Sequence, residues 1–446
     1  MSAGLPVGTG WCFGADGGDD LGAALANFLG SLETKPRLLG LGEPTHGEEE
    51  FPLLRNEVFR QLVEREGYRS VAIESDCLAA LRVDAFVREG ESSLDGVMET
   101  GFSHGFGGSE ANRELVAWMR EYNRRRDTDD RLRFYGFDAP IEMTGAASPR
   151  RALAVLHAYL ASHLEATLLP CTPEAIDRLV GDDGRWTDPA AAMDSSRSVG
   201  ASREAGELRL LTDDLVALLT SESPRLIAAT SHDQWRRACL HGRTAAGLLR
   251  YHAKMADTSG SRAAQLSQLL GQRDAMMNAN LRDIVAQEAR RGPTLVFAHN
   301  RHLQKHRSVW LLPTGWGALE GEVLSWWGAG AIAAAQMGDR YAFLVSALGS
   351  AADQGLDAPE PDTLEGALST IAESRCIFNS RHLAETLSSM GAKLTLRTDA
   401  STNHGYFALD RDQLDRTDGV IFIKDIPSSS HWIRMGDASD ANPQEC

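Results

Sequence analysis

The sequence contains 446 residues, of which 43% are hydrophobic and 24% are charged, and its formal net charge is −17. This composition is typical of a globular protein with a large core and excludes a disordered chain. The excess of carboxylates would repel a phosphate backbone or an anionic bilayer, so we expect neither nucleic acid nor membrane as a partner.

The cysteines and the N-terminal segment indicate the compartment. Six cysteines are scattered along the chain without a CxxC pair, which predicts no disulfide framework and a reduced compartment. The Gly-rich opening segment lacks the basic and apolar regions of a signal peptide, and we expect it to be a flexible lead-in. No uncharged apolar run reaches the length of a membrane span. We therefore expect a cytoplasmic protein.

The first part of the chain alternates between short apolar runs and amphipathic helical patterns. We expect helices over 19–32, 49–65, 77–88 and 110–126, strands over 37–41, 70–73 and 132–137, and a glycine loop over 101–108. This alternation is typical of βαβ units, whose strands form a parallel sheet.

Residues from about 149 to 287 have an almost wholly helical pattern, with breaks near Pro170 and over 181–186. Later strands are expected over 294–298, 341–345, 376–378, 393–396 and 419–423. The sequence therefore predicts an α/β protein with a mainly parallel central sheet, flanking helices and a large helical insertion or cap. We expect an N-terminal α/β half (1–148), a helical insertion (149–287) and a C-terminal α/β half that completes the sheet (288–446).

Reactive side chains follow four of the predicted strands. In chain order these side chains are Glu43 and His46, then Glu74, then Asp138, then His299 and His302. Ligands of open α/β sheets bind beyond the carboxyl ends of the strands. If the sheet is parallel here, all of these groups meet in one crevice.

Histidine beside carboxylate is the combination that acid–base chemistry needs. An imidazole can accept a proton from water near neutral pH and return it, and a carboxylate on its other nitrogen fixes the tautomer. Glu43 and His46 share one turn, and Glu74 arrives from the neighbouring strand. The structural alternatives are a Glu43 that accepts backbone N–H groups, a solvated His46 and an Asp138 confined to its turn. Asp76 is expected to be a structural helix cap.

Three further residues are candidates for substrate binding. Arg55, on the helix after the His46 turn, could hold a substrate oxygen or carboxylate, or could pair with Glu50 or Glu57. Arg273 could pair with a site carboxylate or lie at the surface. His104 lies between glycines and is expected to belong to a lid. With Asp138, these residues form the expected substrate-binding set.

The same imidazoles and carboxylates are ordinary ligands of zinc or manganese, but the H-x-x-H spacing of His299 and His302 is looser than the HExxH motif. We expect no required cofactor, with a divalent metal as the alternative. The sequence has no G-x-S-x-G nucleophile elbow and no phosphate-binding loop after a strand. His232 is expected to be a structural residue at a helix start.

Several blocks resemble the erythromycin-esterase-like family. They occur in the family's order from about residue 37 to 425: LLGLGEPTHGEEEFPLLRNEVFRQLVEREGYRSVAIESD, ELVAWMREYNR, RFYGFDA, RDAMMNANLRD, FAHNRHLQK and DGVIFI. The family is distantly similar to Tiki-type proteases and haem-uptake proteins, which share a G-x-x-H turn and some of which bind metal.

The resemblance implies an α/β core with a helical insertion and the hydrolysis of a lactone ester by an activated water. It also implies His46 as the general base, Glu43 and Glu74 as its carboxylate partners, and His302 as a second site histidine. His299 matches a position that members fill variably. The middle helices, which match least well, are expected to shape the pocket, so a macrolide is one candidate substrate.

The leading hypothesis is a carboxylic ester hydrolase in which His46 activates water, with His302 and Arg55 stabilising the oxyanion. It would act on a small molecule or peptide, and on a macrolide it would give antibiotic resistance. The second hypothesis is a tailoring enzyme of natural-product biosynthesis that performs cyclisation or acyl transfer on a peptide or polyketide. The third is a metal- or haem-binding protein. The oligomeric state is left open.

Overall fold

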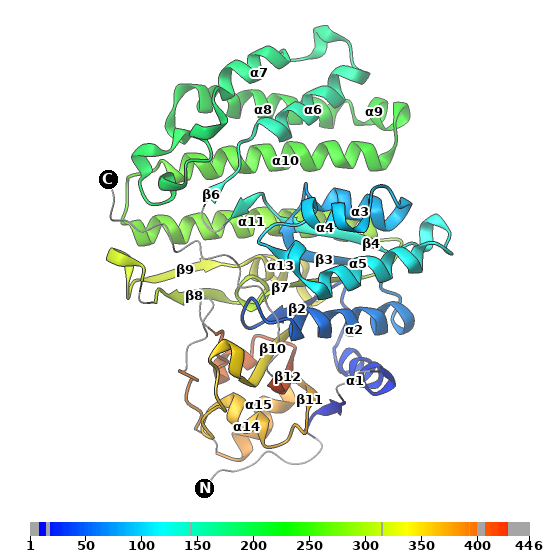
Figure 1. Cartoon of the computed structure of the whole chain (residues 1–446), viewed down its shortest axis with the longest axis vertical. Helices are drawn as coiled ribbons and strands as arrows, with labels where there is room; N and C mark the ends of the chain where they lie inside the picture. The colour runs from blue at the N-terminus through cyan, green and yellow to red at the C-terminus, as the bar shows by residue number, and fades with distance from the viewer. Residues whose placement is uncertain are drawn as a thin grey trace.

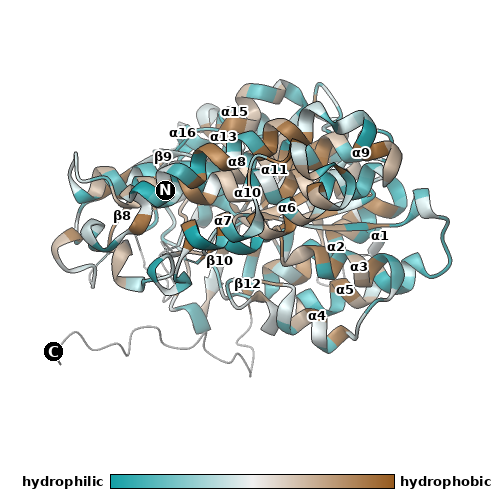
Figure 2. Ribbon diagram, turned by 90° about the horizontal axis from the view of Figure 1, so that it is seen from above, coloured by the Kyte–Doolittle hydropathy of each residue, from teal (hydrophilic) through white to brown (hydrophobic). Residues whose placement is uncertain are grey.

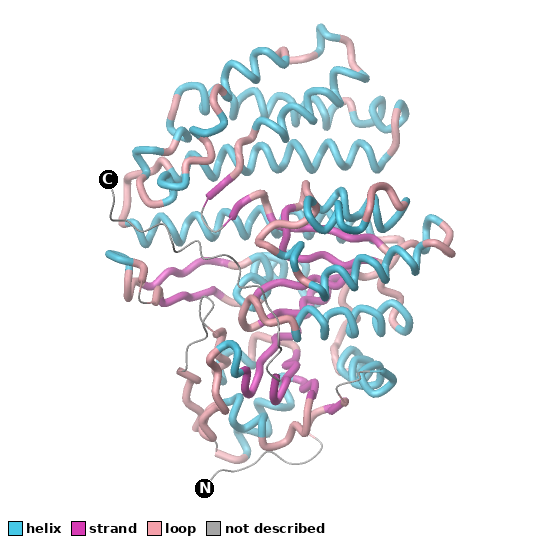
Figure 3. The backbone as a smooth tube through the Cα atoms, in the orientation of Figure 1, coloured by secondary structure: helices cyan, strands magenta, loops and turns pink. Residues whose placement is uncertain are grey.

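The computed structural model describes residues 9–14, 18–142, 145–313, 315–391, 393–398 and 406–426. An eight-stranded sheet lies at its centre with helices around it (Figures 1 and 3). Its strands, in spatial order, are β1 (Trp11–Phe13), β11 (Arg375–Asn379), β12 (Gly419–Ile426), β10 (Tyr341–Ala351), β2 (Leu38–Glu43), β7 (Thr294–His299), β3 (Ser70–Asp76) and β4 (Arg133–Asp138).

The sheet is parallel from β12 to β4. Only the edge formed by β11 and β1 is antiparallel. The α/β fold with a mainly parallel central sheet is therefore confirmed. β7 lies between β2 and β3 in this parallel part of the sheet. The carboxyl ends of β2, β7, β3 and β4, near residues 43, 299, 74 and 138, therefore lie at the same edge of the sheet.

One face of the sheet packs against the N-terminal helices. These are α1 (Gly18–Gly30), α2 (Glu50–Arg65), α3 (Ala80–Glu89), α4 (Leu94–Thr100) and α5 (Glu110–Asn123). Leu39, Val71 and Leu295 point from the sheet into this core. Successive side chains of a strand point to opposite faces, so the residues adjacent to these three in each strand belong to the core on the opposite face of the sheet.

The opposite face carries Leu38, Ala72 and Val296, which pack against Met277 and Leu281. This face is covered by α11 (Arg262–Glu288), α12 (Asn300–Leu303), α13 (Ala329–Met337), α14 (Leu364–Ser369), α15 (Ser380–Ser389) and α16 (Arg411–Leu414). Strands that are buried on both faces have no polar side, which explains the continuous apolar runs in the sequence.

A separate helical layer lies beyond α11 (Figure 1). It consists of α6 (Arg150–His163), α7 (Pro173–Val180), α8 (Arg203–Ser221), α9 (Ser223–Ala229) and α10 (His232–Met255). These helices form their own core, which includes Leu156, Leu208 and Leu249. Hydrophilic and hydrophobic residues alternate along them in Figure 2, as amphipathic helices require. Unlike the other helices of the expected helical block, α11 packs on the sheet. The division of the chain into three segments stays a prediction.

Two small hairpins were not expected from the sequence. β8 (Arg307–Leu311) and β9 (Val323–Trp327) pair antiparallel and project from the side of the sheet (Figure 3). β5 (Ile141–Glu142) and β6 (Gly145–Ala146) form a shorter pair after β4.

In the described part of the chain, no helix has both the length and the apolar character needed to cross a bilayer.

Three expectations were wrong. Residues 11–13 form β1 and pair with β11, so this part of the opening segment is not a loose lead-in. Cys12 and Cys376 face each other across this pair and form a disulfide, which no local spacing could indicate. Residues 393–396 form no strand: only Thr395 makes an isolated bridge, to Thr363. That run has a strand-like composition, but no strand of the described residues lies beside it to form a ladder.

Gly42 in β2 makes room for the side chain of Asn300, which follows β7. Asn300 is fully buried, its side-chain amide donates to the Ser346 carbonyl in β10 at 2.9 Å, and its Oδ1 accepts from Ser346 N at 3.4 Å. The Asn300 side chain crosses β2 at Gly42, where a Cβ would overlap Asn300 Oδ1. Only glycine leaves room for this link between the start of α12 and β10.

Gly42→Ala is therefore expected to lower the free energy of unfolding by about 1–3 kcal/mol, as overpacking does. Asn300→Ala removes the overlapping atom, so the double variant should lose less than the sum of the two single losses. Chemical denaturation of the four proteins gives this comparison. Additive losses would show that Gly42 and Asn300 do not interact.

Candidate active site

The expected convergence of the four strand ends is observed. Glu43 and His299 are register partners at the ends of β2 and β7. Asp76 and Asp138 are register partners at the ends of β3 and β4. Glu74 Oε2 accepts a hydrogen bond from the backbone N–H of His299 at 2.9 Å, which joins the two pairs of strands.

His46 is held by Glu43 on the turn after β2. The His46 Nδ1 to Glu43 Oε1 distance is 2.7 Å, and Gly47, with φ of +78°, closes the turn. Glu43 is buried, whereas 26% of the His46 side chain is exposed. Burial raises the pKa of Glu43, and the hydrogen bond from His46 opposes that rise. His46 therefore has one nitrogen engaged by Glu43 and a fixed ring orientation.

Glu74 is the buried carboxylate at the centre of the site. Its Oε1 lies 3.4 Å from Arg273 Nη2 and 3.3 Å from His302 Nε2. Burial alone would raise the pKa of Glu74, but the charges of His302, His46 and Arg273 outweigh it, and the pKa is lowered. Glu74 is therefore ionised at neutral pH and is a fixed negative charge.

His302 is bound by carboxylates on both ring nitrogens. Its Nδ1 lies 2.9 Å from Asp274 Oδ1, opposite the Glu74 contact. Burial lowers the pKa of His302, but Asp274 and Glu74 raise it more, so the net shift is upward. Because both nitrogens are engaged, His302 is poorly placed for the oxyanion role expected from the sequence and instead anchors Glu74.

Asp274 and Trp326 are site residues that the sequence did not indicate. Asp274 accepts hydrogen bonds from Trp326 Nε1 at 2.8 Å and from Ala329 N at 2.7 Å, in addition to His302. The only signal was the position of Asp274 next to Arg273 in a helix. Trp326 comes from the unexpected hairpin, so no spacing in the sequence could place it.

His299 has its tautomer fixed by the backbone. Its Nδ1 accepts the N–H of Arg301 at 3.1 Å, so a neutral His299 carries its proton on Nε2. The His299 and His46 rings are 4.9 Å apart between centroids. Two histidines thus lie side by side, one held by a carboxylate and the other by a donor.

Asp138 joins Arg273 to His104. Arg273 Nε lies 3.1 and 3.0 Å from the two Asp138 oxygens, and His104 Nε2 lies 3.1 Å from Asp138 Oδ2. Asp138 Oδ1 also accepts from Ala139 N at 2.8 Å, so it stabilises its turn as well as the site. His104 Nδ1 lies 2.7 Å from Glu142 Oε2. His104 has φ of +58° in its glycine loop; lid closure stays a prediction.

Arg55 is buried below the site and does not form either expected ion pair. Its guanidinium donates to Asn112 Oδ1 at 2.8 Å and to Asn56 Oδ1 at 2.7 Å. Burial lowers the pKa of Arg55 to about 10. Glu50 and Glu57 bind Arg375 instead.

A pocket opens beside these residues. Glu43, Arg55 and Glu74 line it, together with Phe106 of the glycine loop and Glu48 of the His46 turn. Burial raises the pKa of Glu48 to about 7. The pocket therefore combines an apolar wall with ionisable groups, as small-molecule sites do.

No group of three or more His, Cys, Asp or Glu among the described residues is arranged to hold a metal ion. Glu74 and His302 are already engaged by Arg273, Asp274 and a backbone N–H. These donors do not fit a divalent metal as they stand, and we derive no step through one. Metal dependence stays a prediction.

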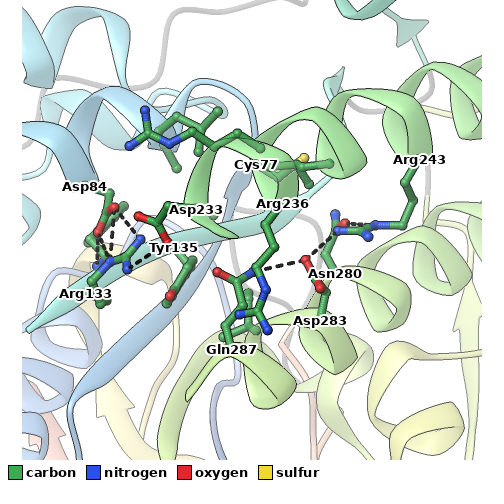
Figure 4. A pocket seen from close by; sticks show the side chains of 17 residues that line it. Cys77, Asp84, Arg133, Tyr135, Asp233, Arg236, Arg243, Asn280, Asp283 and Gln287 are labelled. Atoms are coloured by element: carbon green, nitrogen blue, oxygen red, sulfur yellow. Dashed lines mark hydrogen bonds and ion pairs between the residues drawn. The ribbon is translucent and has the colours of Figure 1, made fainter. Parts of the chain in front are cut away.

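A second pocket lies behind β4, between α3, α10 and α11 (Figure 4). Its main charges are paired within the wall: Arg133 with Asp84, and Arg243 with Asp283. None of the nine candidate residues lines it. All candidate residues that line one of these two pockets therefore line the pocket beside His46.

The sequence model of the erythromycin esterase family matches residues 63–426. The chain belongs to this family. A curated relative, erythromycin esterase type I of Escherichia coli, is 24% identical over 294 residues, which cover 62% of this chain and 64% of the relative. The chain thus matches less than two thirds of that family member's length.

Three solved structures share the fold. A Bacillus cereus protein has a TM-score of 0.65 at 17% identity, with 93% of each chain covered. A succinoglycan biosynthesis protein has a TM-score of 0.60 at 15% identity, with 94% of each chain covered. A mutant of the erythromycin esterase EreC in its open conformation has a TM-score of 0.59 at 17% identity, covering 91% of this chain and 93% of that one.

His104 gives a prediction on pH. Burial lowers the pKa of His104, but its hydrogen bonds to the carboxylates of Asp138 and Glu142 raise it by more, so the net pKa is about 9. Since the folded pKa lies above the ordinary value of 6.5, the stability that protonated His104 contributes is complete below pH 6.5 and is lost as the pH rises through 9. The melting temperature of His104→Gln should fall further below wild type at pH 6 than at pH 10. A gap that stays constant or widens at pH 10 would contradict this account.

Proposed function

We propose that the protein hydrolyses a carboxylic ester or lactone with a water molecule activated by His46. One observation carries this proposal: His46 is bound through Nδ1 by Glu43 and lies beside His299, whose Nδ1 already accepts a backbone N–H. The first ring is thus oriented to accept a proton on Nε2, and the second to donate one from Nε2.

In the proposed reaction, His46 Nε2 takes a proton from water as the water oxygen attacks the carbonyl carbon. The carbonyl oxygen gains the negative charge, and the His299 Nε2–H donates a hydrogen bond to it. The carbonyl then re-forms as the C–O bond to the alcohol breaks, and the imidazolium of His46 returns its proton to the leaving oxygen. The products are an alcohol and a carboxylic acid, which releases its proton to solvent and becomes a carboxylate.

Glu43 and Glu74 have different roles in this proposal. Glu43 fixes the orientation of His46 and stabilises the imidazolium while it holds the extra proton. Glu74, ionised and bound to the His299 N–H, adds a negative potential that favours the same imidazolium. Arg273 and His302 hold Glu74 in place.

Erythromycin is the first substrate to test, because the family is named for its hydrolysis and a curated relative bears that name. Wild-type protein should add one water to the macrolide, with ¹⁸O from labelled water in the new carboxylate. His46→Asn should be slower by roughly 10²–10⁴-fold, the usual contribution of a general base. Mass spectrometry with and without chelator reads out both the reaction and any metal dependence.

The matched control is His232→Asn, which alters a histidine at the exposed start of α10. It should retain wild-type turnover, and both variants should keep the wild-type circular dichroism spectrum. Full turnover by a folded His46→Asn variant would overturn the mechanism, whatever the substrate.

The same base could act on a substrate hydroxyl or amide in place of water, as a tailoring enzyme of natural-product biosynthesis would require. A tailoring role is supported by the structural similarity to a protein described as a succinoglycan biosynthesis protein. In cyclisation or acyl transfer, the products would not gain the mass of a water molecule, whereas in hydrolysis they would. The labelled-water experiment therefore separates the two reactions.

A further inference from the structure

Among the described residues, Arg301 beside the site has no anionic partner for its side chain. Its side chain makes no hydrogen bond or ion pair with any described residue, and its Nε is sealed from solvent. The side chain is partly buried at the start of α12, two residues after His299. Burial lowers the pKa of Arg301 to about 10, so the guanidinium remains charged at neutral pH.

An unpaired guanidinium in this setting is costly, because the charge loses water without gaining a counter-ion. The other arginines near the site are compensated: Arg55 by two asparagines, and Arg273 by Asp138 and Glu74. Only Nε of Arg301 is sealed, so the Nη groups at the tip keep contact with solvent. They can therefore meet a ligand.

Two aromatic rings flank the Arg301 guanidinium. Its Cζ lies 5.7 Å from the centroid of Phe407 and 5.9 Å from that of Trp310 in β8. The rings restrict the guanidinium and supply an apolar surface next to it. A carboxylate joined to an apolar group would match this combination better than a fully hydrated ion would.

Arg301 is also connected to the catalytic turn. Its backbone N–H donates to His299 Nδ1, and the Phe407 ring lies 6.2 Å from the His299 ring. The Phe407 backbone N–H donates to the carbonyl of Pro44, in the turn that carries His46, at 2.8 Å. Arg301, Phe407, His299 and His46 thus form a continuous series of contacts at one edge of the sheet.

We propose that Arg301, together with Phe407 and Trp310, binds a carboxylate on the substrate, so that the enzyme prefers anionic esters with an apolar group beside the carboxylate. The assignment of this carboxylate to a substrate rests on the proposed hydrolysis, whereas the binding of a carboxylate at Arg301 does not. The guanidinium would donate from its Nη groups to the two carboxylate oxygens. This local positive site selects an anion despite the net charge of −17.

Binding can be measured without catalysis. Calorimetry on the His46→Asn variant would compare benzoate with benzamide, which has the same shape without the charge, and with inorganic phosphate. Adding Arg301→Met should weaken benzoate binding by roughly 10–100-fold, the loss expected for a charge-assisted pair. Arg301→Lys should retain part of the affinity, and Arg307→Met, which removes an exposed cation from β8, should retain all of it.

Turnover tests the preference. The ratio of kcat/KM for the mono-p-nitrophenyl ester of succinate to that for p-nitrophenyl acetate should fall about tenfold or more in Arg301→Met and stay constant in Arg307→Met. If the wild type hydrolyses neither ester but benzoate still binds through Arg301, the proposed hydrolysis fails and the carboxylate site stands.

Three results would overturn the proposal. Equal affinity for benzoate in the presence and absence of the Arg301 side chain would do so, even if Arg301→Met lowered the melting temperature, because Arg301 would then only clamp the two rings. Equal affinity of the wild-type side chain for benzoate and benzamide would show that the charge is not recognised. Binding of phosphate but not benzoate would replace the carboxylate with another oxyanion.

Discussion

The site depends on the pairing of buried charges by two consecutive residues of α11. Arg273 binds Asp138 at the end of β4 and Glu74 near the end of β3, while Asp274 binds His302 after β7 and the hairpin through Trp326. Four strand ends place carboxylates and imidazoles together where water is largely excluded, and unpaired charges there would be costly. One helix offsets this cost for three strands and thereby fixes the position of His299 and Glu74.

This pairing explains why chemically similar side chains have different roles. His302 has a carboxylate on each nitrogen, which holds the ring in place and raises its pKa. His299 accepts a backbone N–H and is held as a donor. His46 is bound on Nδ1 by Glu43 and has a partly exposed side chain. The environment of each ring, set by the fold, determines which one could exchange protons with a substrate.

The parallel sheet and the strand-end residues could be predicted because their signals are local. An apolar run followed by a polar residue is visible within ten positions, and the strand that ends in Glu43 needs no partner to be recognised. Asp274, Trp326 and the pairing of Cys12 with Cys376 could not be predicted, because each depends on contacts between distant segments. The run over 393–396 shows the converse: strand-like composition fails without a neighbour to bond with.

The central claim is that Glu43 leaves His46 Nε2 as the proton acceptor, and the protonation of the ring tests this most directly. Burial raises the pKa of Glu43, while its hydrogen bond with His46 opposes that rise, so the position of the shared proton is the quantity to measure. Nitrogen-15 NMR of the imidazoles, with His46 assigned by comparison with His46→Gln, distinguishes these states at neutral pH. The account predicts a protonated Nδ1 and an unprotonated Nε2. A protonated Nε2 with a bare Nδ1 would mean that Glu43 is the donor and that His46 cannot serve as the base.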